Sequence, residues 1–445
     1  MSKPRLVILH RNMGLLGGAQ RDLIVALPEH AKRWSITIAT LNAPQLLLER
    51  CKQLDIEVIT PDVPWQLPTG PIAEVTARAG RSALKAWRRL QSKLQPALDA
   101  ADACYIVLST GGMEVLDIIP NNCPLYVYIH ERDKGIYDDV LQRDMDGQLR
   151  YPLIVKNLAL TYLRRRDQRW HKRLWRRPRT AVSANTPTSS RLLASSHGWP
   201  TSKEWIAGDV KFRDELQRPS EVGVLWPAID PSAWPSEETE HERHVWESFP
   251  HKPTGSYLLT IGRAGFMKGS KEAIQVAAAA ALPLVHVGGG ETEEMNHQAK
   301  KFGAELIVMP RIDDMEIVAL MRNAHALIAT ARTEGFGLTP MEAAMVGTPA
   351  LVVSDCGFTH TVTDEFNGRR LPWPDTEAGL EQWVKAVEQA GVESNRIAWS
   401  KAGRERILER FTADHQAEGL ARSLAAMGVD VETTDLEMLP GLDPA

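Results

Sequence analysis

Short apolar runs alternate with longer helix-like stretches along most of this 445-residue chain, and that alternation constrains the fold more than any other feature. The first half has four strand-like runs, at 5–10, 35–41, 103–109 and 125–130. A second series follows residue 255, with SYLLTIGR, LPLVHVGGG, AELIVMP, HALIATA and TPALVVS. Buried strands that alternate with helices are typical of parallel α/β sheets. The chain exceeds an ordinary domain of roughly 100–200 residues, so we expect two doubly wound domains.

Changes in composition predict where these domains begin and end. We expect an N-terminal domain at 1–229 and a second domain at 256–412. Residues 230–255 between them are polar, contain prolines and show no sustained periodicity, which predicts an interdomain linker with some local structure. A helical pattern at 413–428 precedes a tail at 429–445, which has five acids and no base. We expect that tail to be disordered.

The composition argues against several classes of protein. The formal net charge is -4 at pH 7, so the whole chain has no strong attraction for nucleic acid or a membrane. Its four cysteines form no CxxC pair, which argues against a zinc cluster and a disulfide framework. The N-terminus MSKPRLVILHRN has neither a signal-peptide core nor a membrane-spanning run. We expect a cytoplasmic protein with no metal site and no bound cofactor.

The segment ARTEGFGLTPMEAAMVGTPAL, residues 331–351, is the richest in candidate chemistry. Glu334 precedes a Gly-Phe-Gly turn and Glu342 lies on the helix that follows, which we expect to begin near Thr339 and Pro340. The glycines allow main-chain donors to approach a ligand, and the two carboxylates can accept hydrogen bonds from a sugar. The plain alternative is a capped surface helix. The candidate donor-binding residues here are Gly335, Phe336, Gly337 and Glu342.

This segment resembles the signature of glycosyltransferase family 4, whose GT-B fold has two Rossmann-like domains facing across a cleft. The resemblance extends to IGRAGFMKGS, where Arg263 and Lys268 match a basic pair that the family places on the donor diphosphate. Two fixed cations stabilise the charge that builds on a departing diphosphate. The resemblance implies a retaining, metal-independent hexosyltransferase. Glu334 then positions the hexose and Glu342 the ribose.

The first domain offers weaker candidates. RNMGLLGGAQRDLI follows the opening strand and resembles the family's glycine loop, with Gly17 and Gly18 ahead of a helix. The full dinucleotide fingerprint is absent, so a packing turn remains the alternative. His130 ends the strand-like run LYVYIH, where the family carries a histidine beside the donor sugar. Its alternative is a histidine with satisfied hydrogen bonds at a strand end.

Other segments resemble the family with some departures. SANTPTSSRLL is similar to its serine-led turn, and VLWPAIDPSAW to its interdomain signature. Ala228 stands where asparagine then glycine are usual, and His360 replaces a glutamate, so the sequence departs from the family at the hinge and beside the donor contacts. The tripeptide DMD at 144–146 matches the DxD of another glycosyltransferase class, but its surroundings predict an ordinary turn.

The run RRRDQRWHKRLWRRPR, residues 164–179, is strongly basic and contains two tryptophans. Leu163, Trp170 and Leu174 share one side of the predicted helix. Three interpretations stay open: a solvated or core-covering face, contact with anionic lipid or a lipid-linked acceptor, and contact with nucleic acid.

Together these patterns predict transfer of a hexose from a nucleotide diphosphate sugar, a co-substrate and not a cofactor, to a hydroxyl of a saccharide or lipid-linked glycan. The alternatives are a glycosyltransferase acting on modified nucleobases in DNA, a nucleotide-sugar epimerase of the same fold, and a catalytically silent nucleotide-sugar or nucleic-acid-binding protein. The expected location is the cytoplasm, with peripheral contact at the inner membrane face as a further expectation.

Overall fold

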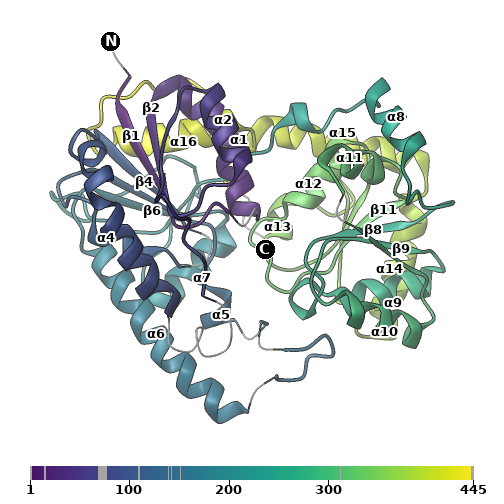
Figure 1. Ribbon diagram of the computed structural model, residues 1–445. Helices are drawn as coiled ribbons and strands as arrows, with labels where there is room; N and C mark the ends of the chain where they lie inside the picture. The colour runs from purple at the N-terminus through teal and green to yellow at the C-terminus, as the bar shows by residue number, and fades with distance from the viewer. Residues whose placement is uncertain are drawn as a thin grey trace. The chain divides into compact units, whose positions relative to one another are not determined.

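The computed structural model of the chain describes residues 3–14, 17–68, 78–108, 111–138, 140–141, 143–150, 152–310 and 312–441. The chain divides into two compact units, each a parallel sheet with helices on both faces (Figure 1). Unit 1 contains Met1–Tyr137, Tyr151–Ala228 and Arg410–Asp443. Unit 2 contains Asp138–Arg150 and Ile229–Glu409. The predicted pair of doubly wound α/β domains is therefore confirmed.

The sheet of unit 1 has seven strands in the order β3-β2-β1-β4-β5-β6-β7, and every neighbouring pair is parallel. Its central strand β4 is buried along its whole length, as expected for a strand covered on both faces. The order reverses between β1 and β4, which makes that point the topological switch of the sheet. The strands are β1 Arg5–His10, β2 Ser35–Thr40, β3 Glu57–Ile59, β4 Ala103–Leu108, β5 Leu125–Ile129, β6 Thr180–Ala184 and β7 Gly223–Val224.

Helices cover both faces of this sheet. One face packs against Trp87 and Leu94 of α4, Leu174 of α6 and Leu193 of α7. On the other, α1 lies beside α16, which also contacts β5. The helices of unit 1 are α1 Gly18–Arg33, α2 Gln45–Gln53, α4 Arg78–Asp99, α5 Lys134–Tyr137, α6 Leu153–Trp175, α7 Pro187–His197 and α16 Ala413–Ala425, with a 3-10 turn η1 at Met113–Asp117.

The C-terminal segment belongs to unit 1 although it follows unit 2 in sequence. Glu418 of α16 is fully buried and accepts hydrogen bonds from Arg33, from Arg422 at 2.6 Å and from the main chain of Thr434. The tail was predicted to be disordered. In the structure, residues 429–441 instead lie along unit 1. The reason is that Glu418 and Arg422 bind its backbone, which its acidic composition does not reveal.

The sheet of unit 2 has six parallel strands in the order β10-β9-β8-β11-β12-β13. The order reverses between β8 and β11, which are hydrogen-bonded neighbours. The strands are β8 Leu258–Ile261, β9 Leu284–Val287, β10 Leu306–Met309, β11 Ala326–Ala329, β12 Ala350–Val353 and β13 Arg369–Leu371. The five runs predicted after residue 255 contain β8 to β12.

Two apolar clusters join the helices of unit 2 to its sheet. Ile274 of α9, Met295 of α10 and Trp383 of α14 form one, and Val318 of α11 and Ala343 of α12 belong to the other. The helices are α8 Glu240–Ser248, α9 Ser270–Ala280, α10 Thr292–Phe302, α11 Asp314–Arg322, α12 Leu338–Met345, α13 Phe358–Thr361, α14 Glu377–Ala390 and α15 Glu393–Arg410, with 3-10 turns η2 Pro231–Ala233 and η3 Phe266–Lys268.

The predicted linker, residues 230–255, is an ordered part of unit 2 that carries η2 and α8. Arg322 of α11 holds it in place through an ion pair with Glu242 at 2.5 Å and through hydrogen bonds to the carbonyls of Pro235 and Ser236.

The DMD tripeptide also lies in unit 2 and forms the predicted turn. The N–H of Gly147 donates to the carbonyl of Asp144, and Met145 is buried in the core of unit 2. Asp146 pairs with Lys271 at 2.6 Å and accepts from Gln298 at 3.0 Å. These carboxylates therefore serve turn formation and packing.

Candidate active site

Lys268 and Glu334 lie on neighbouring connections at the carboxyl edge of the unit 2 sheet. Lys268 ends η3, which follows β8, and Glu334 follows β11. Lys268 Nζ donates to Glu334 Oε2 at 2.7 Å, and the two side chains are 32% and 20% exposed. In open α/β sheets ligands collect outside the carboxyl ends of the strands at the switch point, and β8 and β11 flank that point here.

A close backbone contact fixes the position of Lys268. Gly269 has a φ of +64°, and a Cβ on it would lie 1.9 Å from the carbonyl oxygen of Thr330. Any larger residue would push the β8 and β11 connections apart. Thr330 Oγ1 also donates to the carbonyl of Gly269 at 2.8 Å. The turn that carries Lys268 is therefore joined directly to the connection that carries Glu334.

Arg332 holds the same turn from its other side, and no sequence argument identified it. Its main-chain N–H donates to the carbonyl of Met267, and Nη1 donates to the carbonyl of Phe266 at 2.8 Å. Its guanidinium lies 4.0 Å from the Phe266 ring centroid and pairs with Glu272. Arg332 is thus a positioning residue for Lys268. The only sequence signal was its place just ahead of Glu334.

Arg263 is the second predicted diphosphate ligand. It follows β8 in the same connection as Lys268, and its side chain is exposed. Within the part of the chain that the structure describes, its guanidinium makes no hydrogen bond or ion pair. An exposed cation beside a half-buried one suits a ligand with two phosphate groups, because each phosphate can then meet its own donor.

The Gly-Phe-Gly turn packs tightly against α13. Gly337 has a φ of +93°, and a Cβ there would lie 2.7 Å from the Phe358 ring. A Cβ added to Gly357 would lie 2.3 Å from the carbonyl oxygen of Gly335. Phe336 is buried, so its contribution to a ligand is restricted to its main chain. Glycine at 337 is explained by backbone conformation and packing.

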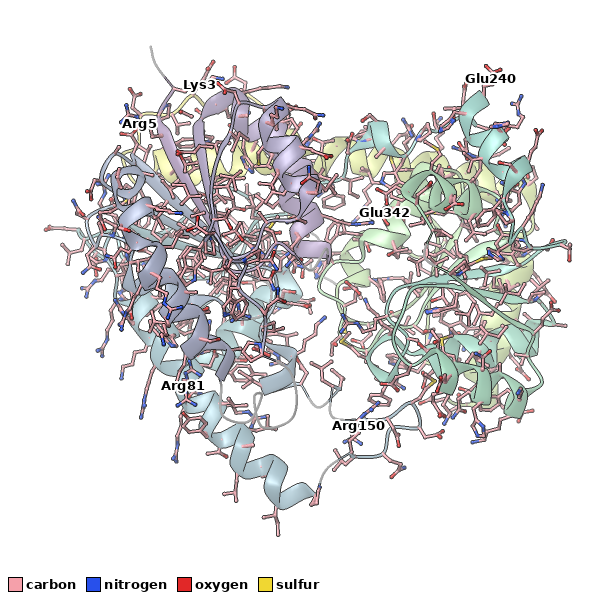
Figure 2. The ribbon with its side chains drawn as sticks, viewed as in Figure 1. Lys3, Arg5, Arg81, Arg150, Glu240 and Glu342 are labelled. Carbon is pink, nitrogen blue, oxygen red and sulfur yellow. The ribbon has the colours of Figure 1, made fainter. Side chains whose placement is uncertain are left out.

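The helix after this turn begins earlier than predicted. It starts at Leu338, and Gly337 is its N-cap without a side-chain hydrogen bond. Thr339 therefore does not cap the helix, because the left-handed backbone of Gly337 already ends the turn, while Pro340 lies in the first turn as expected. Glu342 lies in the second turn, half-buried, and Figure 2 marks it on α12.

His360, which departs from the family pattern, lies in the adjoining helix α13. Its side chain is buried, and its carbonyl accepts a hydrogen bond from Arg406 at 2.8 Å.

The remaining predicted residues lie in unit 1. Gly17 caps α1, Gly18 is its first residue, and both are exposed after β1. Gly17 has a φ of −101°, which any residue can adopt, and its N–H donates to Gln20 Oε1 at 3.1 Å. The structure thus shows a helix N-terminus, which can bind an anion, and a conformation that does not itself require glycine.

His130 follows β5 and is buried. Its Nε2 lies 3.3 Å from Asp22 Oδ2, and its ring centroid lies 4.2 Å from that of Tyr128. Burial, reinforced by the charge of His10, lowers the pKa of His130 to about 3, so its imidazole is neutral. Ala228, the other departure, donates its main-chain N–H to Asp22 at 2.6 Å, a contact that any non-proline residue can make.

Burial also raises the pKa of Asp22 to about 7, although the N–H of Ala228 and the side chain of Gln416 donate to its carboxylate. With a pKa of about 7 Asp22 is about half ionised at pH 7, and its contact with the neutral ring of His130 connects α1 to the carboxyl end of β5.

Two parallel α/β sheets, each with a switch point, are the architecture of the GT-B fold. Residues 245–406, all in unit 2, match the model of the family Glycosyl transferases group 1. This segment of the chain matches the family that the sequence resembles, and the predicted resemblance is confirmed.

Individual relatives support the same placement. Lipopolysaccharide glucosyltransferase WaaG of Escherichia coli K12 is 26% identical over 194 residues, which cover 42% of this chain and 51% of WaaG. O-antigen chain mannosyltransferase C of Escherichia coli is 27% identical over 232 residues, or 51% of this chain and 58% of the relative. The chain thus spans about half the length of the curated relatives it matches.

Solved structures extend the likeness of fold over nearly the whole chain. The crystal structure of WaaG matches with a TM-score of 0.60 at 17% identity and covers 96% of this chain and 99% of that one. Anabaena HepE in complex with UDP-glucose matches with a TM-score of 0.61 at 15% identity and covers 95% and 99%. None of the helices in the described ranges is long and apolar enough to cross a membrane.

Proposed function

We propose that the protein is a retaining hexosyltransferase that uses a nucleotide diphosphate sugar. The observation that carries this proposal is the pairing of Lys268 with Glu334 at the switch point of unit 2. A diphosphate requires fixed cations and sugar hydroxyls require hydrogen-bond acceptors, and the pair supplies one of each. The names of the relatives, a glucosyltransferase and a mannosyltransferase, favour a hexose.

The proposed reaction is transfer on one face of the sugar. The acceptor hydroxyl oxygen forms a bond to the anomeric carbon as the bond from that carbon to the diphosphate oxygen breaks. The departing phosphate oxygen takes the hydroxyl proton, so no protein nucleophile is required. Lys268 and Arg263 stabilise the negative charge that builds on the diphosphate, which lowers the barrier more than it strengthens ground-state binding.

Carboxylates and main-chain groups would orient the donor. Glu334 would accept hydrogen bonds from hexose hydroxyls and Glu342 from the ribose. The first turn of α12 points its N–H groups toward the Gly335–Gly337 connection, and the positive end of the helix dipole favours an anion there. Glu334, Glu342 and the Gly335–Gly337 connection belong to one short stretch of chain, which supports a single site in unit 2 for these donor contacts.

Unit 1 would contribute Gly17, Gly18 and His130. The glycines begin α1, whose N-terminal N–H groups suit a phosphate or a sugar hydroxyl. His130 would act as a neutral hydrogen-bonding group beside the sugar, because its lowered pKa removes the positive charge at neutral pH. Asp22 would orient the ring through its contact with Nε2.

The nature of the acceptor is proposed from the outward surface of α6. In the basic run, Trp170 and Trp175 pack against the core of unit 1 and Leu174 is fully buried. The helix side that Leu163, Trp170 and Leu174 were predicted to share therefore covers the core at the C-terminal end of α6.

A different set of apolar side chains is exposed on α6. Ile154, Leu158 and Tyr162 are 75%, 71% and 51% exposed and follow one another at intervals of four residues, so they share one face of the helix. Arg165 and Arg169 continue the same face, where they line a hollow of about 700 Å³ with Leu158 and Tyr162. Apolar side chains beside arginines match an anionic lipid surface, whereas DNA offers nothing apolar on its backbone.

We therefore favour an acceptor that is lipid-linked or lies at an anionic membrane surface. The DNA-modifying alternative requires the basic residues alone, and it leaves the exposure of Ile154 and Leu158 unexplained.

A screen of nucleotide sugars by thermal shift tests the proposed donor, because a ligand of the native state raises the melting temperature. We expect one base and hexose combination to stabilise the protein most. Following donor consumption with and without lipid-linked acceptors then separates the alternatives: an epimerase converts the donor without an acceptor, and a silent binding protein consumes none. Failure of every nucleotide sugar to bind would overturn the proposal.

A further inference from the structure

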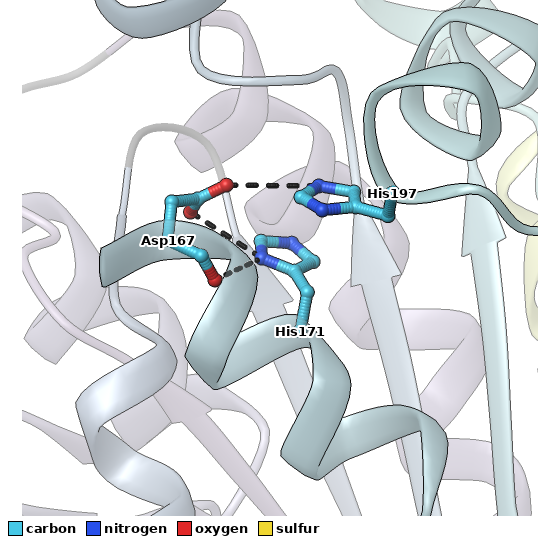
Figure 3. Close-up of side chains that lie close together, drawn as sticks. All are labelled: Asp167, His171 and His197. Carbon is cyan, nitrogen blue, oxygen red and sulfur yellow. Dashed lines mark hydrogen bonds and ion pairs between the residues drawn. The ribbon is translucent and has the colours of Figure 1, made fainter. Parts of the chain in front are cut away.

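Three side chains that neither the fold nor the proposed reaction requires meet between α6 and α7. Asp167 and His171 lie one helical turn apart on α6, and His197 ends α7 (Figure 3). One carboxylate oxygen and one nitrogen of each imidazole lie within 4.8 Å of one another. The side chains of His197, His171 and Asp167 are 2%, 8% and 16% exposed, so the group has little contact with solvent.

His197 lacks the contacts that a buried histidine ordinarily has. Its side chain is 2% exposed, and neither ring nitrogen has a hydrogen-bond partner in the described part of the chain. Its Nε2 points toward Asp167 Oδ2, 3.6 Å away, which is longer than a hydrogen bond. Buried polar atoms are normally satisfied, so this arrangement indicates a missing partner.

We propose that Asp167, His171 and His197 bind a divalent transition-metal ion of the zinc class. Two imidazoles and one carboxylate form a ligand set that zinc commonly uses. Bonds of roughly 2.0–2.1 Å in a tetrahedron separate ligand atoms by about 3.3–3.5 Å. The distances from Asp167 Oδ1 to His171 Nδ1, 3.3 Å, and from Asp167 Oδ2 to His197 Nε2, 3.6 Å, are close to that separation, so either carboxylate oxygen lies near one of the two imidazoles.

The surroundings favour coordination. Tyr137 Oη donates to Asp167 Oδ2 at 2.8 Å and orients the carboxylate, as outer partners of metal ligands commonly do. Tyr137 lies in α5, so the ion would join α6 and α7 and would bring α5 into the same network.

Binding requires one local movement. The two imidazole rings are stacked, with centroids 3.9 Å apart and planes at 13°. A metal bonds along the in-plane lone pair of a ring nitrogen, so coordination by both histidines must turn one ring out of the stack. The His171 Nδ1 contact with the Asp167 carbonyl at 3.0 Å would also be exchanged for the metal.

Zinc titration of the full chain by calorimetry, after treatment with chelator, tests this site. We expect one equivalent of Zn²⁺ to bind and the melting temperature to rise. NMR should show that the ring-proton signals of two histidines move, because the stack opens. Asp167→Asn and His197→Gln should each weaken binding at least tenfold. The matched control His297→Gln removes an exposed histidine of unit 2 and should leave Zn²⁺ affinity unchanged.

Circular dichroism and donor binding of each variant would show that the fold survives. If a variant does not fold, Co²⁺ added to the wild-type chain provides the second test, since tetrahedral nitrogen and oxygen ligation gives visible absorption bands. Absence of Zn²⁺ binding at one equivalent, or equal affinity in His197→Gln and wild type, would overturn the proposal. The three residues would then be an Asp–His cluster that only packs α6 against α7.

Discussion

Lys268 Nζ and Glu334 Oε2 are 2.7 Å apart, and each side chain comes from the connection after one of the two strands that flank the switch point of unit 2. The fold creates this contact, because Gly269 allows the β8 connection to touch Thr330 of the β11 connection. A bound diphosphate would attract Lys268 away from Glu334 and leave that carboxylate to accept from the sugar. The contact between Lys268 and Glu334 could thus be replaced by two contacts with a donor, one from each side chain.

Glu342 should contribute mainly to binding of the donor nucleotide. Glu342→Ala removes a carboxylate in the second turn of α12, and we expect kcat/KM to fall about tenfold or more with the fold intact. Glu381→Ala, an exposed glutamate on α14 of the same unit, is the matched control and should keep wild-type kinetics. Steady-state kinetics with varied donor concentration gives kcat/KM for both variants. Equal kcat/KM values for the two would show that Glu342 is not part of the site.

The configuration of the product distinguishes the proposed reaction from its inverting counterpart. With an α-linked donor, proton NMR of the early product should show an α-linked sugar, because attack and departure occur on the same face. Turnover should continue in EDTA below the melting temperature, since the metal site proposed in unit 1 supplies no group to the reaction. A β-linked product, or complete loss of turnover in EDTA, would contradict the proposed reaction.

Asp22 predicts a pH dependence of stability that can be isolated by mutation. Burial raises its pKa from 3.8 to about 7 in the folded state. Between about pH 4 and pH 7 the native chain therefore holds this proton while the unfolded chain releases it, so the Asp22 contribution to stability decreases as pH rises. The decrease is on the order of 1.4 kcal/mol per pH unit and ends above the folded pKa.

Asp22→Asn retains the Oδ1 acceptor for Ala228 and Gln416 and cannot titrate. As pH rises from about 4 to 7, the unfolding free energy of this variant should therefore increase relative to that of the wild type. The lowered pKa values of His130 and His10 make stability increase as pH rises, which is the opposite effect. They do so in both the wild type and the variant, so their contribution largely cancels in the difference between the two. Denaturant titrations that give a pH-independent difference would show that Asp22 is ionised in the folded chain.

The exposed face of α6 predicts binding to anionic vesicles. Surface attraction is worth about 1 kcal/mol per basic residue, so Arg165→Gln with Arg169→Gln should weaken binding about tenfold or more, and added salt should weaken it in wild type. Leu158→Ser should also weaken it. Sedimentation with phosphatidylglycerol vesicles measures the effect.

The control for this surface is Lys52→Gln with Lys203→Gln, two exposed lysines elsewhere in unit 1, which should bind vesicles nearly as wild type does. Donor affinity should be unchanged in all of these variants. Binding to duplex DNA that is insensitive to Leu158→Ser would favour the nucleic-acid alternative. If neither vesicles nor DNA bind at low salt, α6 is a solvated face and a small acceptor becomes the better proposal.

The runs that contain β1, β2, β4, β5 and β8 to β12 could be predicted from sequence for a physical reason, whereas β3, β6, β7 and β13 were not predicted. Strands that are covered on both faces, such as β4 and β12, are continuous apolar runs, and such runs are visible without knowledge of their neighbours. The attachment of residues 138–150 to unit 2 and of 410–441 to unit 1 could not be predicted, because contacts between distant segments leave no local periodicity.

The candidate site was predictable in part. Lys268, Glu334 and Glu342 were selected as candidates because their motifs resemble those of a known family, and their local spacing alone would have been weak evidence. Arg332 was missed because its importance lies in contacts with η3 and not in its own pattern. The cluster with His197 was missed because its members lie on two helices, and only the pairing of α6 with α7 brings them together.

The kinetics of Lys268→Ala test the central proposal most directly. With a donor identified by the screen, kcat should fall at least tenfold, because the variant lacks a cation that stabilises the departing diphosphate. Lys300→Ala, which removes an exposed lysine of α10, should have the wild-type kcat. A wild-type kcat in Lys268→Ala, with the fold intact, would contradict the placement of the donor diphosphate at the Lys268–Glu334 pair.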